Sequence, residues 1–403
     1  MMKNLRETSG YGLLMLISCG TAFGCYFGSN MRLPVVPLYA RSLGIDTVQI
    51  GFINSAFFLM AGFLSLPLGF VSDRLGRKRI ACLGLLVISG ASFLLYFSHT
   101  FIQLTWSYLL IGAGLAAFGP TMMSFVADIS PATHLGRSYG WYTTAIYCGM
   151  SLGPAFGGFV AQASGYLQVF VVSGVLVFLN FWILVFFLPG TRLILEPSSH
   201  RQNTFTQLGR LFKNRPLLGC WLVTLGGCFG LGMFITFIPL HAQNQHLSVG
   251  QIGLVFFVQG LTNAASRIPL GYLSDKVADR KILVAFGMIG FAAAMAGFGW
   301  SRTANHFMIF GIALGISMGL AFTSVGALIA ETVAPESRGL AMGGYNTCIY
   351  FGMMLSSALM GTVIQKIGFD GGFYLTAVVN MILMAVFYVF MKNFSASNHQ
   401  SSP

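Results

Sequence analysis

The chain has 403 residues, of which 55% are hydrophobic and only 8% are charged. Soluble domains are about 25% charged, so this composition excludes a cytoplasmic enzyme, a nucleic-acid-binding protein and a disulfide-stapled secreted module. The net charge of +12 therefore needs an explanation other than a polyanionic partner. The seven cysteines form no C-x-x-C pair and are interpreted as packing residues.

Apolar stretches long enough to cross a bilayer as helices, which takes about 20 residues each, follow one another along the chain. They predict an all-α integral membrane protein of twelve transmembrane helices in two pseudo-symmetric six-helix bundles. The expected spans are 11–38, 48–70, 80–98, 101–126, 139–161, 167–188, 217–240, 250–272, 281–300, 304–329, 340–363 and 371–391.

The segments that join these spans alternate in charge. Most of the 22 basic residues fall on the side that holds both termini, whereas Arg32, Arg41, Arg302 and Lys366 fall on the other side. The positive-inside rule then predicts a multi-pass protein of the inner or plasma membrane with both termini in the cytoplasm. The positive net charge is thus a topology signal.

The second half of the chain repeats the first at a spacing of about 202 residues. Residues 37–40 read P-L-Y-A where residues 239–242 read P-L-H-A, and Y-T-T-A-I-Y-C-G from Tyr142 corresponds to Y-N-T-C-I-Y-F-G from Tyr345. Duplicated six-span units are typical of transporters whose halves rock about a midplane site. The predicted organisation is an N-terminal bundle at 1–190, a cytoplasmic linker at 191–216, a C-terminal bundle at 217–392 and a polar tail at 393–403.

A basic turn follows the second span and is repeated in the other half. It reads G-F-V-S-D-R-L-G-R-K-R from Gly69 to Arg79, and G-Y-L-S-D-K-V-A-D-R-K from Gly271 to Lys281. The glycines would permit a tight turn and Asp73 could cap a helix start. The alternative is a basic loop that only sets orientation.

This turn resembles the loop signature of the major facilitator superfamily. The resemblance implies a cytoplasmic gate of charged pairs, in which Asp128 could meet Arg77 and Glu331 could meet Arg280. The gating candidates of this region are Gly69, Asp73, Arg74, Gly76, Arg77, Asp128, Asp275, Arg280 and Glu331.

The fifth span carries a second motif, from Gly140 to Gly158, that fits G-x8-G-x3-G-P-x2-G-G at every fixed position. It resembles the antiporter motif of the twelve-helix drug:proton antiporter branch, which implies efflux and proton coupling. Gly149, Gly153 and Gly157 form a stripe that lets another helix approach, and Pro154 permits a kink. Generic small-residue packing is the alternative for the stripe.

The charges inside the membrane differ from those of many relatives. Tyr108 stands where many superfamily members carry Arg, and all ten acidic residues fall in loops or at span ends. An intramembrane carboxylate is the usual proton carrier and the usual partner of cationic drugs. If transport is coupled to protons, the proton is carried by Asp128, Asp73 or Glu331, or by the substrate itself.

Two arginines remain within the spans, and they favour an anionic or zwitterionic cargo. The alternatives are that Arg32 snorkels to the outer interface and that Arg267 caps carbonyls or contacts lipid headgroups. Polar and aromatic side chains on matching faces complete a hypothetical cavity. Its candidates are Tyr26, Asn30, Arg32, Asn54, Thr143, Tyr147, Gln259, Asn263, Arg267, Asn346 and Tyr350.

These features predict a secondary-active transporter that exports a small anionic or amphiphilic organic compound by alternating access. No catalytic residue, cofactor, metal site or nucleic-acid partner is expected. His241 and His246 are expected in an outer loop, and their spacing is weak evidence for a metal site. The chain is expected to act as a monomer in the bilayer. An importer of a metabolite or siderophore-like anion is the alternative on the same fold. A membrane sensor or an intramembrane enzyme is the alternative from another class.

Overall fold

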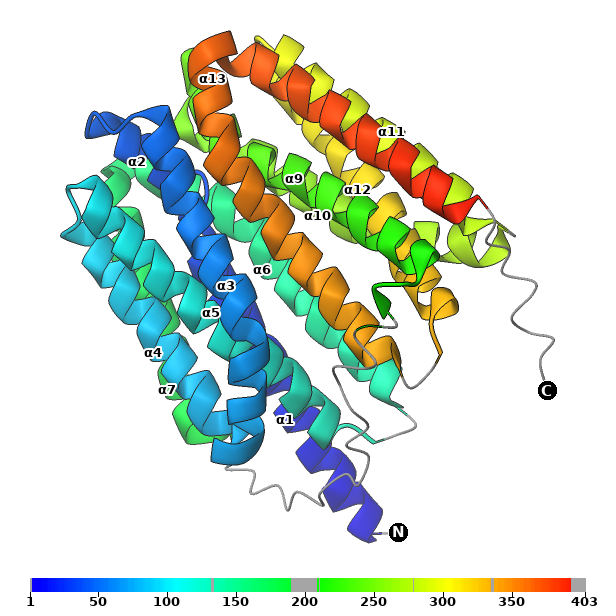
Figure 1. The fold of residues 1–403 in the computed structure, drawn as a ribbon. Helices are drawn as coiled ribbons and strands as arrows, with labels where there is room; N and C mark the ends of the chain where they lie inside the picture. Colours follow the sequence, from blue (N-terminus) through cyan, green and yellow to red (C-terminus); the bar gives the residue numbers. More distant parts are fainter. Residues whose placement is uncertain are drawn as a thin grey trace.

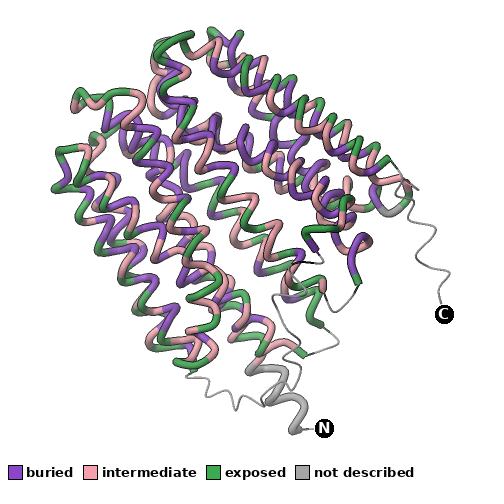
Figure 2. The backbone as a smooth tube through the Cα atoms, viewed as in Figure 1, coloured by how far each residue is buried: buried purple, intermediate pink, exposed green. Residues whose placement is uncertain are grey.

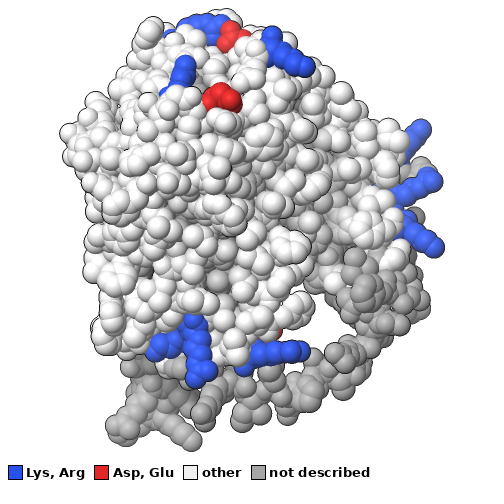
Figure 3. All heavy atoms as spheres, turned by 60° about the vertical axis from the view of Figure 1, so that its left-hand side comes forward, with Lys and Arg blue, Asp and Glu red and all other residues white. Residues whose placement is uncertain are grey.

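A computed structural model describes residues 2–131, 134–189, 209, 211–277, 279–334 and 337–392, and their side chains from residue 11 onward with the exception of Asp275. Most of the expected linker at 191–216 and the whole expected tail at 393–403 lie outside these ranges. On the face that Figure 3 shows, the described charged side chains lie at the top, along the bottom and at the right edge, and the broad area between them is uncharged.

The described ranges fold into helices that alternate in direction (Figure 1). Ten of them are long and apolar enough to cross a membrane by length and composition, while the more polar α10 supplies a further long helix. The first half contains α1 (Met2–Asn30), α2 (Val35–Ser42), α3 (Thr47–Leu75), α4 (Arg77–Tyr96), α5 (Phe101–Ile129), α6 (Leu135–Ser164) and α7 (Tyr166–Phe187). The second half contains α9 (Arg215–Asn244), α10 (Val249–Lys276), α11 (Arg280–Trp300), α12 (Ala304–Thr332) and α13 (Arg338–Met391).

The observed helices differ from the expected spans in two places. The first expected span, 11–38, is broken between Asn30 and Val35, where Pro34 lacks the N–H that would continue the helix. The last two expected spans are the two helices of α13, which meet at a tight turn at Gly368, with φ of 76°, instead of through a loop. With α1 and α2 counted as one interrupted span and α13 as two, the described helices give twelve crossings.

Matching local contacts in the two halves reflect the sequence repeat. Lys78 at the start of α4 donates from Nζ to the carbonyl of Leu188, beyond the end of α7, at 2.5 Å. Its counterpart Lys281 at the start of α11 donates to the carbonyl of Met391, at the end of α13, at 3.5 Å. Cations favour helix C-termini because the last carbonyls are unpaired and the helix dipole is negative there. The same lysine therefore ties the same pair of helices in each half.

The halves lie side by side, with α3 against α13 and α6 against α10 (Figure 1). We call the side where α1 begins and α13 ends the terminus side, and the other the opposite side. The turns α3–α4 and α10–α11 lie on the terminus side, and the α2–α3 and α9–α10 turns lie on the opposite side. Buried residues concentrate where helices meet, whereas the outward faces are exposed (Figure 2).

Candidate functional site

The halves are joined by polar contacts on the opposite side. Arg41, at the end of α2, donates from Nη1 to the carbonyl of Leu240 in α9 at 3.2 Å. The backbone N–H of Gly250 in α10 donates to Oε1 of Gln162 in α6 at 3.1 Å. Each bond links one half to the other, so both fix the relative position of the halves near their opposite-side ends.

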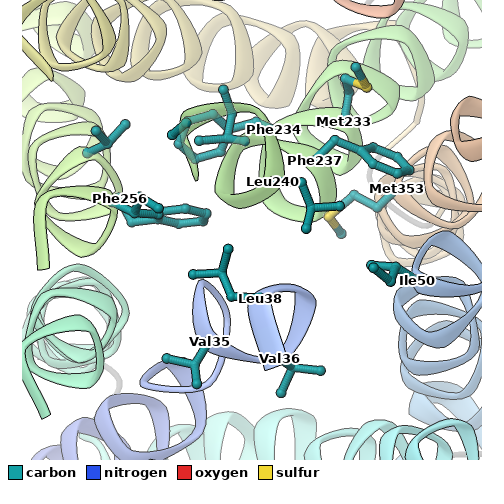
Figure 4. Close-up of a cluster of buried hydrophobic side chains, with 14 of the residues drawn as sticks. Val35, Val36, Leu38, Ile50, Met233, Phe234, Phe237, Leu240, Phe256 and Met353 are labelled. Carbon is teal, nitrogen blue, oxygen red and sulfur yellow. The ribbon is translucent and has the colours of Figure 1, made fainter. Parts of the chain in front are cut away.

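An apolar plug fills the space between α2 and α9 on the opposite side (Figure 4). Leu38 and Leu240, each at most 1% exposed, extend from α2 and α9 respectively. The sequence analysis missed this feature, because an apolar residue inside an apolar span gives no contrast in polarity. The plug consists of Val35, Val36, Leu38, Ile50, Phe234, Phe237, Leu240 and Phe256, which all belong to one buried cluster.

Backbones also come into contact between the halves, through glycines. A Cβ atom on Gly253 of α10 would lie 2.5 Å from the carbonyl oxygen of Pro154 in α6. A Cβ on Gly361 of α13 would lie 2.8 Å from the carbonyl oxygen of Thr47 in α3. Real Cβ atoms do not approach this closely, so only glycine allows these helices to meet. The opposite side is therefore closed by backbone contact as well as by the plug.

The terminus-side parts of α3 and α10 are not packed in this way. In α3 no residue between Ala61 and Ser72 is buried, and in α10 none between Asn263 and Ser274 is buried. These stretches correspond in the sequence repeat, so the same length of helix is uncovered in each half. The halves thus separate toward the terminus side while they remain joined on the opposite side.

A cation–π contact lies between α6 and α10, on the terminus side of the place where these two helices are packed together. The guanidinium carbon of Arg267 sits 4.4 Å from the ring centroid of Tyr147, which belongs to the other half. Nε of Arg267 donates to Oδ1 of Asn263 at 3.4 Å. Tyr345 of α13 interacts electrostatically with both Arg267 and Tyr147. Three of the candidate cavity residues, Tyr147, Asn263 and Arg267, are thus brought together.

Two further candidates complete an aromatic cluster at this level. A Cβ on Gly62 of α3 would lie 2.8 Å from Cβ of Tyr350, so Tyr350 also crosses between the halves. Tyr26 of α1 lies near Tyr147 and Tyr350. We call Tyr26, Tyr147, Tyr345 and Tyr350 the tyrosine cluster. Sequence reasoning missed Tyr345 as a site residue, although its alignment with Tyr142 was visible in the repeat.

Other cavity candidates are held by local partners. Asn30 and Asn54 are buried and donate to the carbonyls of Tyr26 and Ile50 at 2.6 and 3.4 Å. Gln259 donates to the sulfur of Met318 in α12 at 3.2 Å. Each of these contacts stays within one half.

The last two polar candidates lie on the terminus-side part of α6 and α13. Thr143 donates to the carbonyl of Tyr139 at 2.7 Å, and Asn346 is exposed. Thr143 and Asn346 lie one helical turn from Tyr147 and Tyr350, on the same faces of α6 and α13.

Arg32 does not reach the membrane surface. It lies in the break between α1 and α2, its side chain is 2% exposed, and Nη1 donates to Oγ of Ser92 in α4. Its Nε donates to the carbonyl of Ser29 at 3.3 Å. The side chain is therefore enclosed within the first half, away from the Arg267–Tyr147 contact.

The glycine stripe of α6 packs against α1. A Cβ on Gly149 or Gly153 would lie 2.6 Å from the carbonyl oxygen of Phe23 or Phe27. Gly157 approaches the carbonyl of Met31 in the same way. Tyr147 faces the second half, so one face of α6 is pressed against its own bundle while another carries the cluster. Pro154 lies inside the helix and takes part in the contact with α10.

Charged pairs connect helix ends on the terminus side within each half. Arg77 contacts Asp73 at 2.7 Å and also Asp128 at the end of α5. Arg280 contacts Glu331 at the end of α12. The side chain of Asp275 lies outside the described set, and Arg74 is exposed.

Three details of the basic turn and the outer side differ from expectation. Gly69 lies inside α3, and only Gly76, with φ of 96°, makes the turn. Asp73 binds Arg77 and does not cap α4, whose N-cap is Gly76. His241 belongs to α9 and is buried, with Nε2 2.9 Å from the carbonyl of Phe298. Within the described ranges, no three His, Cys, Asp or Glu side chains are placed to hold a metal ion.

Solved structures similar to this chain are transporters. A nucleoside transporter, NupG, superposes with a TM-score of 0.81 over 94% of this chain and 99% of its own, at 14% identity. A bacterial homologue of the human lysosomal transporter Spinster, inward-facing and unoccupied, gives a TM-score of 0.78 over 96% of this chain and 98% of its own, at 16% identity. At these identities the likeness concerns the fold.

Sequence relatives agree with the fold. An uncharacterized MFS-type transporter of Methanocaldococcus jannaschii is 23% identical over 92% of this chain and 96% of its own length. The quinolone resistance protein NorA of Staphylococcus aureus is 29% identical, over 63% of this chain and 64% of its own length. The sequence model of the Major Facilitator Superfamily matches residues 18–248 and 221–402. This multi-pass membrane protein therefore belongs to the Major Facilitator Superfamily of transporters.

Proposed function

We propose that this transporter exports a small organic compound with an anionic group and an apolar or aromatic body. The single observation that carries the proposal is the position of Arg267, half-buried between the halves and over the ring of Tyr147. Among the described side chains no carboxylate pairs with Arg267. A cation at this depth in a membrane protein is costly unless it faces water, a partner or a ligand, so an anionic ligand would offset its cost.

The repeat shows that the cation is specific to one half. Arg267 corresponds to Ser65 at the spacing of 202 residues, and Tyr147 corresponds to Tyr350. The Tyr350 side of the pseudo-symmetric arrangement therefore has aromatic surface without a cation. A compound with a charged end and an apolar end fits this asymmetry, with its anion at Arg267 and its apolar part on the tyrosine cluster.

The proposed direction is efflux. It is supported by the complete fifth-span motif from Gly140 to Gly158 and by the partial similarity to the quinolone resistance protein NorA. We further propose that both termini are cytoplasmic, that the chain acts as a monomer, and that protons drive transport through Asp73, Asp128 or Glu331 or on the cargo itself. In that orientation the described conformation opens to the cytoplasm, where an exporter loads.

Comparison of metabolites tests the proposal directly. Cells that lack the gene, cells that overproduce the protein and cells that overproduce the Arg267→Gln variant are compared for compounds inside the cells and in the medium. Compounds with a carboxylate, sulfonate or phosphate and an apolar body are expected to accumulate inside the deletion cells and in the medium of the overproducers. The Arg267→Gln variant should behave like the deletion.

Arg137→Gln is the matched control, because Arg137 is exposed at the start of α6 and lies far along the helix from Tyr147. It should export as the unaltered protein does, at equal amounts in the membrane. Normal export by Arg267→Gln, or the export of cations alone, would overturn the assignment of the site. Accumulation inside the overproducing cells would instead support the importer.

A further inference from the structure

Arg32 is the most deeply buried cation among the described side chains, and it lies apart from the proposed central site. Its side chain is 2% exposed, and the Nη2 nitrogen is buried without a hydrogen-bond partner in the described part of the chain. The hydroxyl of Ser29, from the last turn of α1, is also buried; within the described part of the chain it forms no hydrogen bond of ordinary geometry, and the thiol of Cys25 lies close to it. Two donors are therefore enclosed in one small region between α1, α4 and α5.

The groups around the guanidinium only partly balance its charge. Nε and Nη1 are bound by the carbonyl of Ser29 and the hydroxyl of Ser92. The last carbonyls of α1 contribute the negative end of a helix dipole. The ionisable side chains close to Arg32 are Tyr108 and Cys25, which are both neutral acids, and no carboxylate forms an ion pair with Arg32 in the described ranges. A neutral water molecule could accept from Nη2, but it would leave the charge unbalanced.

The enclosure also limits what could balance the charge. Ser92 and Tyr108 are at most 4% exposed, and Ser29 Oγ is fully buried. The plug residues Val35 and Val36 follow directly in sequence and are at most 1% exposed. A cargo-sized molecule would have to displace several of these packed side chains, whereas a single-atom ion requires the smallest rearrangement.

We propose that Arg32, with the hydroxyl of Ser29, forms an occluded binding site for a small monovalent anion of the size of chloride. Nη2 of Arg32 and Oγ of Ser29 are the donors. The site lies at the break that separates α1 from α2, so an anion bound there stabilises the bend that places α2 in the plug. The site is separate from the central cluster and does not depend on the identity or direction of the cargo.

Chloride dependence of stability tests this site in the purified full-length protein. Thermal unfolding is followed in detergent in sodium chloride and in sodium gluconate at equal ionic strength, and binding of ³⁶Cl⁻ is measured by equilibrium dialysis. Chloride and bromide should raise Tm by about 2–4 °C in a saturable way relative to gluconate. About one chloride should bind per chain, because the region has one unpaired guanidinium.

Three variants separate this site from general salt effects. Ser29→Ala keeps the cation and removes one donor, so it should weaken chloride binding several-fold. Arg32→Gln should abolish both binding and the Tm response. Arg267→Gln should keep both, which shows that the two sites are independent and that failure of one proposal does not imply failure of the other.

Several outcomes would overturn the proposal. Equal Tm values in chloride and gluconate would mean that water alone satisfies Arg32, and unchanged ³⁶Cl⁻ binding in Arg32→Gln would place the ion elsewhere. If Arg32→Gln fails to fold, unchanged binding by Ser29→Ala would still count against the assigned donors. Displacement of ³⁶Cl⁻ by equimolar benzoate would assign the site to the carboxylate of an organic cargo.

Discussion

At the scale of single residues, the two intramembrane arginines have different surroundings despite equal residue type. Arg267 faces the other half across Tyr147, whereas Arg32 is directed at Ser92 inside its own bundle. The sequence located both cations within the membrane, but it could not give the direction of Arg32. That direction depends on the bend between Asn30 and Val35, where the helical periodicity is interrupted.

Glycine in the basic turn gives a prediction at the same scale. Gly76 has φ of 96°, which an L-residue rarely adopts, while a Cβ on Gly69 would meet nothing within 4 Å. Gly76→Ala should therefore destabilise the protein by about 1–3 kcal/mol through backbone strain. Gly69→Ala should be neutral or stabilise α3 by up to about 1 kcal/mol, since alanine favours helices.

Thermal unfolding of both purified variants checks this pair. A loss of Tm in Gly76→Ala alone is the expected result. Equal losses in the two variants would show that Gly69 is needed for packing, contrary to the open space beside it.

At the scale of helices, the sequence predicted those contacts that involve charged residues among apolar ones or residues at a fixed spacing. The paired ends of α4 and α5 and of α11 and α12, the stripe on α6 and the repeat between the halves all have such signals, and their contacts lie where the sequence suggested. The plug of α2 and α9 has none, because Leu38 and Leu240 resemble every other apolar residue of their spans. The sequence also did not predict the tight turn within α13, where Gly368 alone joins two helices for which a loop was expected.

The stripe of α6 supports a prediction about helix contact. A methyl group at Gly153 would lie 2.6 Å from the carbonyl of Phe27, whereas one at Gly140 would meet nothing within 4 Å. Gly153→Ala should force α1 and α6 apart, lower stability by about 1–3 kcal/mol and impair transport while the protein still inserts. Gly140→Ala should leave Tm and transport unchanged, although Gly140 is also a fixed position of the motif. Impairment by both variants would mean that the motif acts through something other than packing on α1.

At the scale of the whole molecule, the two halves touch on the opposite side and separate toward the terminus side. The contacts of Gly253 with Pro154 and of Gly361 with Thr47 involve backbone atoms, which cannot adapt to added bulk. Alternating access on this fold therefore requires the halves to part along these glycines and to approach each other on the terminus side. The repeat predicted the two halves, but sequence alone could not show which side is closed.

Distances between spin labels test this motion most directly. In a background whose seven cysteines are replaced by serine, one pair of labels is placed at Ser164 and Asn244 on the opposite side. A second pair is placed at Arg137 and Arg338 on the terminus side. A control pair at Arg79 and Arg137 lies within one half. All of the label positions are exposed. The perturbation is Gly361→Trp, which adds bulk where α13 touches α3.

In lipid nanodiscs, Gly361→Trp should lengthen the distance between Ser164 and Asn244 and shorten the distance between Arg137 and Arg338. The distance between Arg79 and Arg137 should stay the same, because each half moves as a unit. Distances that stay unchanged on both sides, or that lengthen together on both sides, would contradict the account of two halves pivoting about a central site.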